Sequence, residues 1–439
     1  MKLRKNIRML VMISLILSNV ISSPFANKIY ANGGAGGSKA SIEFKNDAKK
    51  DPDEEGVSGG EFKTVILGCG ERYTDVLAGS VLANERQCQI LLTKTESIDN
   101  VTMNEIKRID PDEIIVLGGP EAVSRNVVNK LKAYKVTRLG GEDRYETAKI
   151  IGEQVRKISG NKKAVNLVVG TNFPDAMTIS PLAIQNRTPI LLTPTDDLEG
   201  YTTKALKDWD INKVTIAGRY EAVSQNVEHN LRKYLGISKV DRIGGEDRYE
   251  TAAEISKKVT EITRNTSKSV VVRGDDFPDA LTITSLAALN NSGILLTQTD
   301  NLNDFTKNIL RLNKTSKVII GGGLSAVSKQ VENEIRKMPS SIERIGGEDR
   351  YETAVKISQR FDNIIEQITS SKTASANLDL SDENSPETSV SLGKLFRHEI
   401  ENNDKATTNK AMTSNENSSN NENKKSFIDY IKELFNINK

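Results

Sequence analysis

The stretch "RIGGEDRYETA" occupies Arg242–Ala252, recurs letter for letter at Arg344–Ala354, and occurs at Arg138–Ala148 with Leu139 in place of isoleucine. We call this stretch the signature. Its first glycine falls at 140, 244 and 346, so the copies are 104 and then 102 residues apart. Solenoid repeats have periods of roughly 20 to 50 residues, whereas about 100 residues is the size of a domain that folds alone. The sequence therefore predicts three duplicated modules.

Three further motifs keep the same order around each signature. The first module has "YTDV" at Tyr73–Val76 where the later two have "FPDA", at Phe173–Ala176 and Phe277–Ala280. An order kept three times indicates that the whole module was duplicated, and not the signature alone. "ILLT" occupies 90–93, 190–193 and 294–297, and "AVS" occupies 122–124, 222–224 and 326–328.

Short apolar runs alternate with longer amphipathic stretches within each module. In the first module these runs are "TVILG", "QILLT", "EIIVLGG" and "KVTRLGG". Strands that consist of continuous Val, Ile and Leu runs, with helices between them, are typical of parallel βαβ units. The sheets of such units are buried on both faces. We therefore expect three small α/β modules, at 62–160, 161–264 and 265–366.

The segments that flank the modules have different compositions. Residues 1–31 begin with basic residues and continue with the apolar run Met9–Leu17, which is typical of an export signal and too short for a membrane span of about 20 residues. We expect a secreted protein with no membrane span after signal cleavage. A Gly-rich and acidic linker follows at 32–61. The tail at 367–439 is of low complexity and typical of disorder, apart from a possible amphipathic helix in "SFIDYIKELF".

The overall composition argues against a nucleic-acid partner and against a disulfide framework. With 61 basic and 59 acidic residues the formal net charge is +2, so a long-range positive field is lacking. Any anion must therefore be held by a local arrangement of charges. The two cysteines, Cys69 and Cys88, both fall in the first module, and we interpret them as small apolar core residues.

Much of the signature is typical of the start of a helix. Two glycines allow a tight turn after a strand, and Asp143 then stands three residues before Glu146, which is the spacing of a capping box. The other two copies repeat this pair. In "NFPDA", we expect Asn172 to cap the next helix and Pro174 to begin it.

Capping does not explain the arginine and tyrosine that follow the aspartate in every copy. One interpretation is that each arginine folds back onto a carboxylate of its own module. The other is that its planar guanidinium binds a phosphate or carboxylate of a ligand through two hydrogen bonds. Three such sites on one chain would bind a repeating polymer strongly through multivalency. The residues concerned are Arg144, Arg248, Arg350, Tyr145, Tyr249 and Tyr351.

The sequence offers little for catalysis. Its two histidines are His229 in the second module and His398 in the tail, so no module holds a set of zinc ligands, and Cys69 has no histidine within its module. The carboxylate pair Asp275 and Asp276 has no counterpart in the second module, which argues against a repeated glycosidase pair. We therefore predict no enzyme activity, no cofactor and no bound metal.

Taken together, "GGEDRYETA", "FPDA", "ILLT" and "AVS" resemble the clostridial cell wall binding repeat 2 family, which occurs as three tandem copies in exported surface proteins of Gram-positive bacteria. The resemblance covers approximately Phe62 to Ile365. It implies Rossmann-like modules that pack with pseudo-threefold symmetry within one chain. It also implies non-covalent attachment to an anionic cell wall polysaccharide or teichoic-acid-like polymer.

In that family the Ile-Leu-Leu stretch is implicated in anchoring. The alternative is a buried strand that supports the site indirectly, since apolar side chains do not bind phosphates. The modules are also unequal, because Arg219 and Tyr220 precede the second "AVS" motif where the first module has Gly119 and Pro120. The stretch falls on Ile90, Leu91, Leu92, Ile190, Leu191, Leu192, Ile294, Leu295 and Leu296.

These observations predict a secreted, wall-associated protein whose three α/β modules form a non-covalent anchor for an anionic glycopolymer. Two alternatives stay open at this point. One is a wall-lytic amidase or a modifier of one, and the other is a surface adhesin that acts through the tail. The charged group of the polymer and the oligomeric state do not follow from the sequence.

Overall fold

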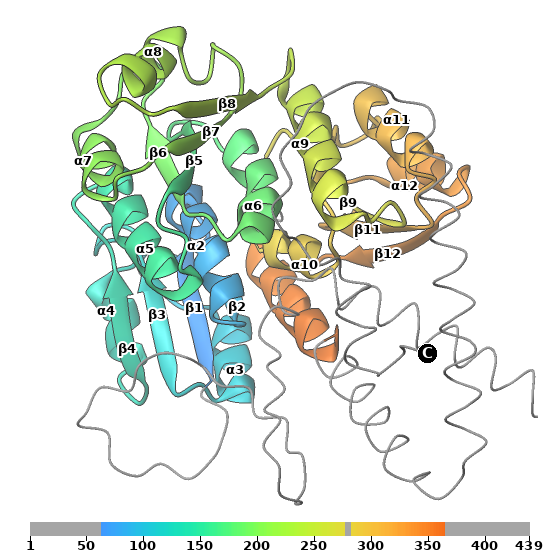
Figure 1. Cartoon of the computed structure of the whole chain (residues 1–439). Coiled ribbons are helices and arrows are strands. Elements are labelled where there is room, and N and C mark those ends of the chain that lie inside the picture. Colours follow the sequence, from blue (N-terminus) through green and yellow to red (C-terminus); the bar gives the residue numbers. More distant parts are fainter. Residues whose placement is uncertain (1–62, 277–281, 365–439) are drawn as a thin grey trace, which may run out of the picture. The chain divides into compact units, whose positions relative to one another are not determined.

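The computed structural model describes residues 63–276 and 282–364, which form three parallel sheets with their helices (Figure 1). We call each sheet with its helices a module. The predicted export signal, linker and tail lie outside the described residues. Among the described helices, none has the length and apolar character needed to cross a membrane.

The first module is built on a sheet with the strand order β2-β1-β3-β4. The central strand β1 pairs in parallel with both β2 and β3, so the chain turns to opposite sides of β1 in succession. In open α/β sheets, ligands usually bind at the carboxyl ends of the strands where this switch occurs. The elements are β1 (Thr64–Cys69), α2 (Tyr73–Glu85), β2 (Gln89–Thr93), α3 (Asn100–Ile109), β3 (Glu113–Leu117), α4 (Arg125–Lys130) and β4 (Lys135–Leu139).

The second and third modules repeat this topology, with the strand orders β6-β5-β7-β8 and β10-β9-β11-β12. The predicted α/β fold with parallel sheets is confirmed. The second module comprises β5 (Ala164–Val169), α6 (Pro174–Asn186), β6 (Ile190–Thr193), α7 (Gly200–Asp208), β7 (Lys213–Ala217), α8 (Gln225–Lys233) and β8 (Lys239–Ile243). The third comprises β9 (Lys268–Arg273), α10 (Ile283–Leu289), β10 (Ile294–Thr297), α11 (Asp304–Leu312), β11 (Lys317–Gly321), α12 (Lys329–Arg336) and β12 (Ser341–Ile345).

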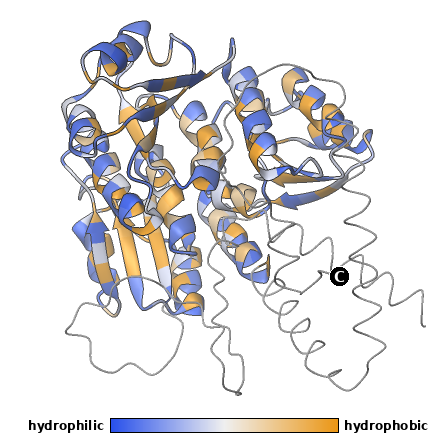
Figure 2. Ribbon diagram, in the orientation of Figure 1, coloured by the Kyte–Doolittle hydropathy of each residue, from blue (hydrophilic) through white to orange (hydrophobic). Residues whose placement is uncertain are grey.

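The inner strands of each sheet are buried on both faces, which explains their continuous apolar sequences (Figure 2). In β2, the side chains of Ile90 and Leu92 join a core that is shared by all three modules, whereas Leu91 joins the core of its own module. The equivalent strands β6 and β10 divide their side chains in the same way.

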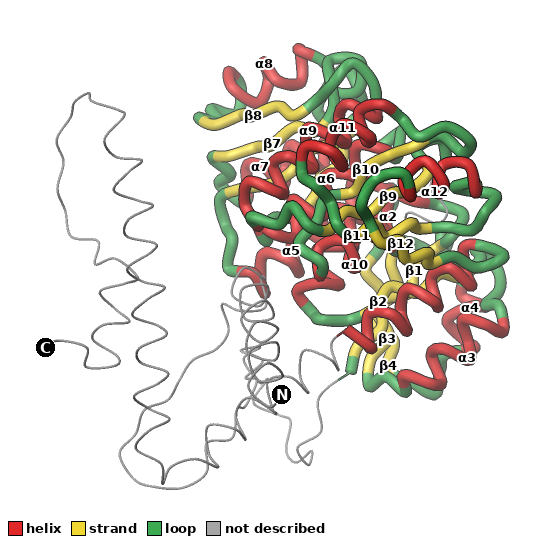
Figure 3. The backbone as a smooth tube through the Cα atoms, turned by 90° about the vertical axis from the view of Figure 1, so that its right-hand side faces the viewer, coloured by secondary structure: helices red, strands yellow, loops and turns green. Residues whose placement is uncertain are grey.

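One hydrophobic core joins the three modules. The helices α2, α6 and α10 contact one another, and Val76, Met177 and Ile283 from these helices belong to a single buried cluster. The rings of Tyr73 and Phe173 meet edge to face with centroids 6.0 Å apart. Figures 1 and 3 show the three helices in the middle of the described residues, with the sheets around them. This is the expected pseudo-threefold packing.

The helix that follows each signature connects one module to the next, and we call these three the signature helices. They are α5 (Arg144–Ser159), α9 (Arg248–Thr263) and the helix at 350–364. Helix α5 packs against α2 of its own module and β6 of the next, and α9 packs against α6 and β10. The helix at 350–364 packs on the first module, where Val355 joins the core. The three modules therefore close into a ring.

A buried carboxylate fastens the last signature helix to the first module. Glu105 of α3 is 2% exposed and accepts hydrogen bonds from Arg108, from the Ser358 hydroxyl at 2.7 Å and from Gln359 at 3.2 Å. Burial favours the protonated form, but these donors outweigh it and hold the pKa of Glu105 below its usual value. Arg108 also bonds to Asp362 at 2.5 Å.

We predict that Glu105→Ala lowers the free energy of unfolding by about 3 kcal/mol, because it leaves buried donors of this network without an acceptor. Hydrogen exchange should accelerate in the helix at 350–364 more than elsewhere. Glu96→Ala, at an exposed position in the same module, is the control. Equal exchange in both variants would show that Glu105 does not hold the ring closed.

Candidate functional site

The start of each signature helix is capped as the sequence predicts. In the first copy, Asp143 Oδ1 accepts the backbone N–H groups of Tyr145 and Glu146, both at 2.9 Å. In turn, the Glu146 carboxylate accepts a hydrogen bond from the backbone N–H of Glu142 at 2.6 Å. The other two copies make the same bonds. The aspartate and second glutamate of the signature therefore serve the backbone.

The prediction that Asn172 caps α6 is wrong. The N-cap is Phe173, which has helical backbone angles and no side-chain capping bond. Asn172 stands one residue too early, and its side chain accepts the N–H of Phe173 at 3.0 Å instead. Pro174 does begin the helix, as expected.

The first letters of the signature hold two loops together. Arg138 donates to the carbonyl oxygens of Gly118 at 2.6 Å and Val123 at 2.8 Å. A Cβ at Gly140 would lie 2.3 Å from the carbonyl carbon of Gly118, so only glycine allows this approach. Farther along, the Thr147 hydroxyl accepts the N–H of Gly141 at 3.0 Å. These residues have a structural role at the carboxyl edge of the sheet.

The signature arginine crosses to the next module. It donates to the carbonyl of the glycine that follows the first strand there, and the last copy reaches back to the first module. The pairs are Arg144 with Gly170 at 2.5 Å, Arg248 with Gly274 at 2.8 Å, and Arg350 with Gly70 at 2.6 Å.

The signature tyrosine packs on the same glycine. A Cβ placed on this glycine would meet the tyrosine ring at 2.9 to 3.0 Å, so a larger residue does not fit without movement. We call each set of arginine, tyrosine and glycine a joint. The pairs are Tyr145 with Gly170, Tyr249 with Gly274, and Tyr351 with Gly70.

In the first two modules, the charge of the signature arginine also influences the pKa of a buried aspartate of the same module. Asp75, in the first turn of α2, is 7% exposed. Burial raises its pKa to about 6, and the nearby charges of Arg144 and Arg72 offset part of this rise. Asp175 in α6 also has its pKa raised to about 6 by burial, with Arg248 acting against it. No ion pair joins Arg144 to Asp75 or Arg248 to Asp175 within the described residues, so the arginine acts on the carboxylate of its own module through its charge, while its hydrogen bond crosses the joint.

Sequence reasoning did not foresee the burial of this first-turn aspartate. The signal was that "YTDV" and "FPDA" keep the aspartate while the letters around it change. The structure shows why: Gly118 and Gly218 have positive φ, and a Cβ on either would lie within 2.4 Å of the Asp75 or Asp175 carboxylate.

The Ile-Leu-Leu side chains do not reach the surface. All nine are 0 to 4% exposed. Around Gly170 the structure brings together Leu192, Arg144 and Tyr145, and Leu296 likewise lies beside Gly274. Two sets of residues that the sequence predicted separately thus meet at these two joints. Their part in polymer binding stays a prediction.

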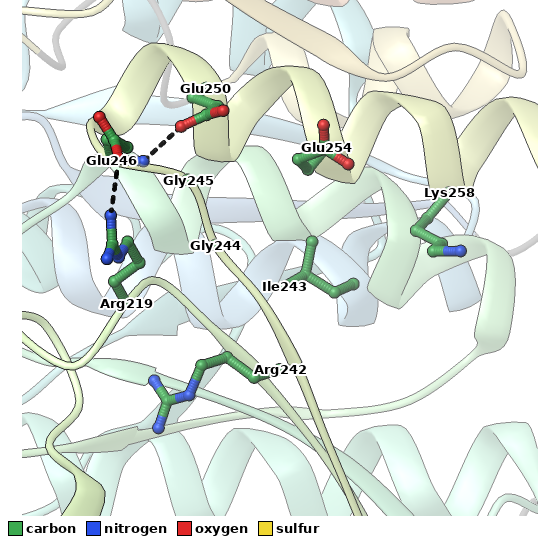
Figure 4. A pocket seen from close by; sticks show the side chains of 9 residues that line it. All are labelled: Arg219, Arg242, Ile243, Gly244, Gly245, Glu246, Glu250, Glu254 and Lys258. Carbon is green, nitrogen blue, oxygen red and sulfur yellow. Dashed lines mark hydrogen bonds and ion pairs between the residues drawn. The ribbon is translucent and has the colours of Figure 1, made fainter.

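An open depression of about 310 Å³ lies beside α9 in the second module (Figure 4). Arg219 points across it to Glu246, with 3.6 Å between the charged groups. The guanidinium of Arg242 is held by Glu228, and Lys258 pairs with Glu261. Because Glu250 and Glu254 also line the depression, it is not a basic cradle for an anion. The lining residues are Arg219, Arg242, Ile243, Gly244, Gly245, Glu246, Glu250, Glu254 and Lys258.

The remaining polar candidates do not form a metal site. Within residues 63–276 and 282–364, no three His, Cys, Asp or Glu side chains gather as a set of metal ligands. Cys69 and Cys88 are free and buried, which confirms their interpretation as core residues. Burial raises the pKa of the Cys88 thiol to about 12.

The sequence model of the family described as Cell wall binding domain 2 (CWB2) matches residues 20–128, 138–228 and 242–332. The chain belongs to this family. Membership in CWB2 supports binding to the cell wall and a location at the wall or surface.

Two curated relatives of this CWB2 protein come from Bacillus subtilis (strain 168). The amidase enhancer is 33% identical over 274 residues, 62% of this chain and 36% of that protein. The N-acetylmuramoyl-L-alanine amidase LytC is 29% identical over 275 residues, 62% of this chain and 53% of that protein. The chain thus spans about a third and a half of their lengths.

Two solved structures from Clostridium difficile share the CWB2 fold of this chain. Cwp8 has a TM-score of 0.55 with 29% identity and covers 64% of this chain and 48% of its own. Cwp6 has a TM-score of 0.53 with 23% identity and covers 68% and 44%.

The buried aspartate predicts a pH dependence of stability. The pKa of Asp75 is about 6 in the fold and about 3.9 in an unfolded chain, so the folded state binds the extra proton between these values. The stability this proton contributes is complete below about pH 4 and is lost as the pH rises through 6. Asp75→Asn, which cannot ionise, should therefore gain about 2–3 kcal/mol over wild type between pH 4 and 7.

Denaturant unfolding at several pH values measures this difference. Asp110→Asn, at an exposed position of the same module, is the matched control. A difference between wild type and Asp75→Asn that stays constant with pH would contradict the buried, proton-binding carboxylate.

Proposed function

We propose that this protein is a non-covalent anchor that attaches to the cell wall by binding an anionic wall glycopolymer through its three modules. The observation that carries the proposal is that three CWB2 repeats, each with the same joint, close into one ring. Because the ring holds the surfaces of all three modules on one body, weak contacts that any of them makes to a repeating polymer add up to tighter binding.

We further propose that the modules bind without catalysing a reaction, and that the protein is exported to a Gram-positive wall. The two curated relatives named for an amidase and its enhancer each extend well beyond the part that resembles this chain. The match of this chain to the CWB2 model is the finding that bears on its function, so wall binding is the property that we propose for it.

The signature and Ile-Leu-Leu residues contribute to polymer binding by holding the joints in place. Nearly complete burial leaves Leu192 and its eight counterparts no surface with which to touch a polymer. Each joint arginine donates one guanidinium N–H to a glycine carbonyl, and Arg144 and Arg248 also lie beside a buried carboxylate. Their charge is thereby largely used within the protein.

Co-sedimentation with purified Gram-positive walls tests the anchor. We expect wild type to bind intact walls, to bind less as salt rises because the contacts are ionic, and to lose binding when the anionic polymers are removed. Binding that survives removal of these polymers would contradict the proposal. A fall in wall turbidity caused by the protein alone would instead indicate lysis.

A separate experiment tests the role of the joints. Arg144→Ala should lower the free energy of unfolding by about 1–3 kcal/mol, since it removes a charged hydrogen bond and leaves the Asp75 carboxylate without its counter-charge. Under conditions where the variant is folded, wall binding should stay within about threefold of wild type. Loss of binding by a fully folded variant would show that the guanidinium contacts the polymer directly.

A further inference from the structure

The outer edges of the three sheets carry different charges. Each edge consists of the helix after "AVS" and the last strand of the sheet, that is α4 with β4, α8 with β8, and α12 with β12. The segments 221–242 and 325–344 each hold four Lys or Arg residues and three acidic residues. The equivalent segment of the first module, 121–138, holds five Lys or Arg residues and one acidic residue. Of the three edges, only that of the first module therefore carries a large excess of positive charge.

In the second and third modules a glutamate pairs with the arginines of this edge. Glu228 of α8 accepts from Arg232 at 3.0 Å and from Arg242 at 3.1 Å. Glu332 of α12 accepts from its neighbours on the helix and from Arg344 of β12 at 3.0 Å. The pKa of Glu332 is lowered to about 2, first by the hydrogen bond from Lys329 and next by that from Arg336. At both edges the arginines of the helix and of the last strand are therefore paired, whereas Lys233, Lys239 and Lys337 form no ion pair within the described residues.

In the first module this glutamate is replaced by Val128. Arg138 of β4, the counterpart of Arg242 and Arg344, bonds only to carbonyl oxygens. Burial lowers the pKa of Arg138, and the positive charge of Arg125 lowers it further. Neither arginine forms an ion pair with a carboxylate within residues 63–276 and 282–364.

The surrounding side chains extend this positive surface. Arg125, Lys130 and Lys132 are exposed and form no ion pair within the described residues. Lys135 is exposed as well, and its ammonium lies 3.8 Å from the largely buried Glu113. Figures 1 and 3 show α4 and β4 at the outer side of the first sheet, away from the central helices α2, α6 and α10. An extended ligand could reach them without displacing any described element.

We propose that this edge of the first module, formed by Arg125, Lys130, Lys132 and Arg138, is the surface that binds a linear polyanion carrying phosphate or carboxylate groups. The inference rests on the proposed function and deepens it, because it names the edge of the three-module ring at which the phosphate or carboxylate groups are bound. The ring of joints then serves to present this edge.

The second module supplies the substitutions that test the proposal. Arg125→Gln, Val128→Glu and Lys130→Asn together give the first module the residues found at the same positions of α8. The carboxylate introduced by Val128→Glu would lie where Glu228 pairs with Arg242, so the fold has a precedent for it. Immobilised inorganic polyphosphate and poly-L-glutamate are the probes, and the full chain is measured at several salt concentrations.

We expect the triple variant to bind the favoured probe about 100-fold more weakly at low salt, since each cation near an anionic surface contributes about tenfold or less. The dependence of log affinity on log salt should flatten by about two to three, the number of charges lost. The probe whose binding is lost identifies phosphate or carboxylate as the recognised group. Unchanged affinity and salt dependence in a folded variant would overturn the proposal.

A reciprocal variant distinguishes direct binding by these side chains from an indirect effect of the substitutions on folding. Gln225→Arg with Glu228→Val gives α8 the residues of α4 at these two positions and frees Arg232 and Arg242 from their carboxylate. This variant should bind the same probe more tightly than wild type, which a purely structural role of the edge does not predict. If wild type binds walls but neither probe, the anchor stands and the polyanion-binding edge fails. If the triple variant binds the probe as wild type does but aggregates more, the basic side chains serve only to keep the exposed strand edge from pairing with other chains. The proposal fails in that case as well.

Discussion

The hydrogen bond from each signature arginine to a glycine carbonyl of the following module is the contact on which the ring depends. It is charge-assisted, half-buried and made three times, and the last copy joins residues 280 apart in sequence. The tyrosine beside it fills the space that a side chain on that glycine would occupy. The signature therefore hardly varies because most of its residues have a partner in the scaffold, and the arginine and the tyrosine have theirs in another module.

The same constraint explains why the most repeated residues are poor candidates for polymer contact. A strand such as β6 has one face in the common core and one in its own module, so a change at Leu191 or Leu192 disturbs the packing of one core or the other. The residues that repeat between the modules are thus mostly residues of the interior. Recognition has to be sought at exposed positions, and these are the positions at which the modules differ.

Local features of the fold follow from the sequence, and distant ones do not. The capping pair Asp143 and Glu146 could be predicted because both partners lie within five residues of each other along one helix start. The prediction failed at Asn172 by one residue, since the preceding loop decides where a helix begins. The bond from Arg350 to Gly70 could not be foreseen, because spacing says nothing about which module a helix packs on.

The outer edges show how a duplicated fold can diverge in function with little loss of stability. The pairs that Glu228 makes with Arg232 and Arg242 lie near the surface, where ion pairs contribute little to folding. Exchanging such a glutamate for Val128 keeps the helix and the contact of Arg138 with the Gly118 carbonyl. The local electrostatic potential changes, because the basic side chains that a glutamate pairs with in the other modules are here available to attract an external anion. One module can thus acquire recognition while the other two keep the ring intact.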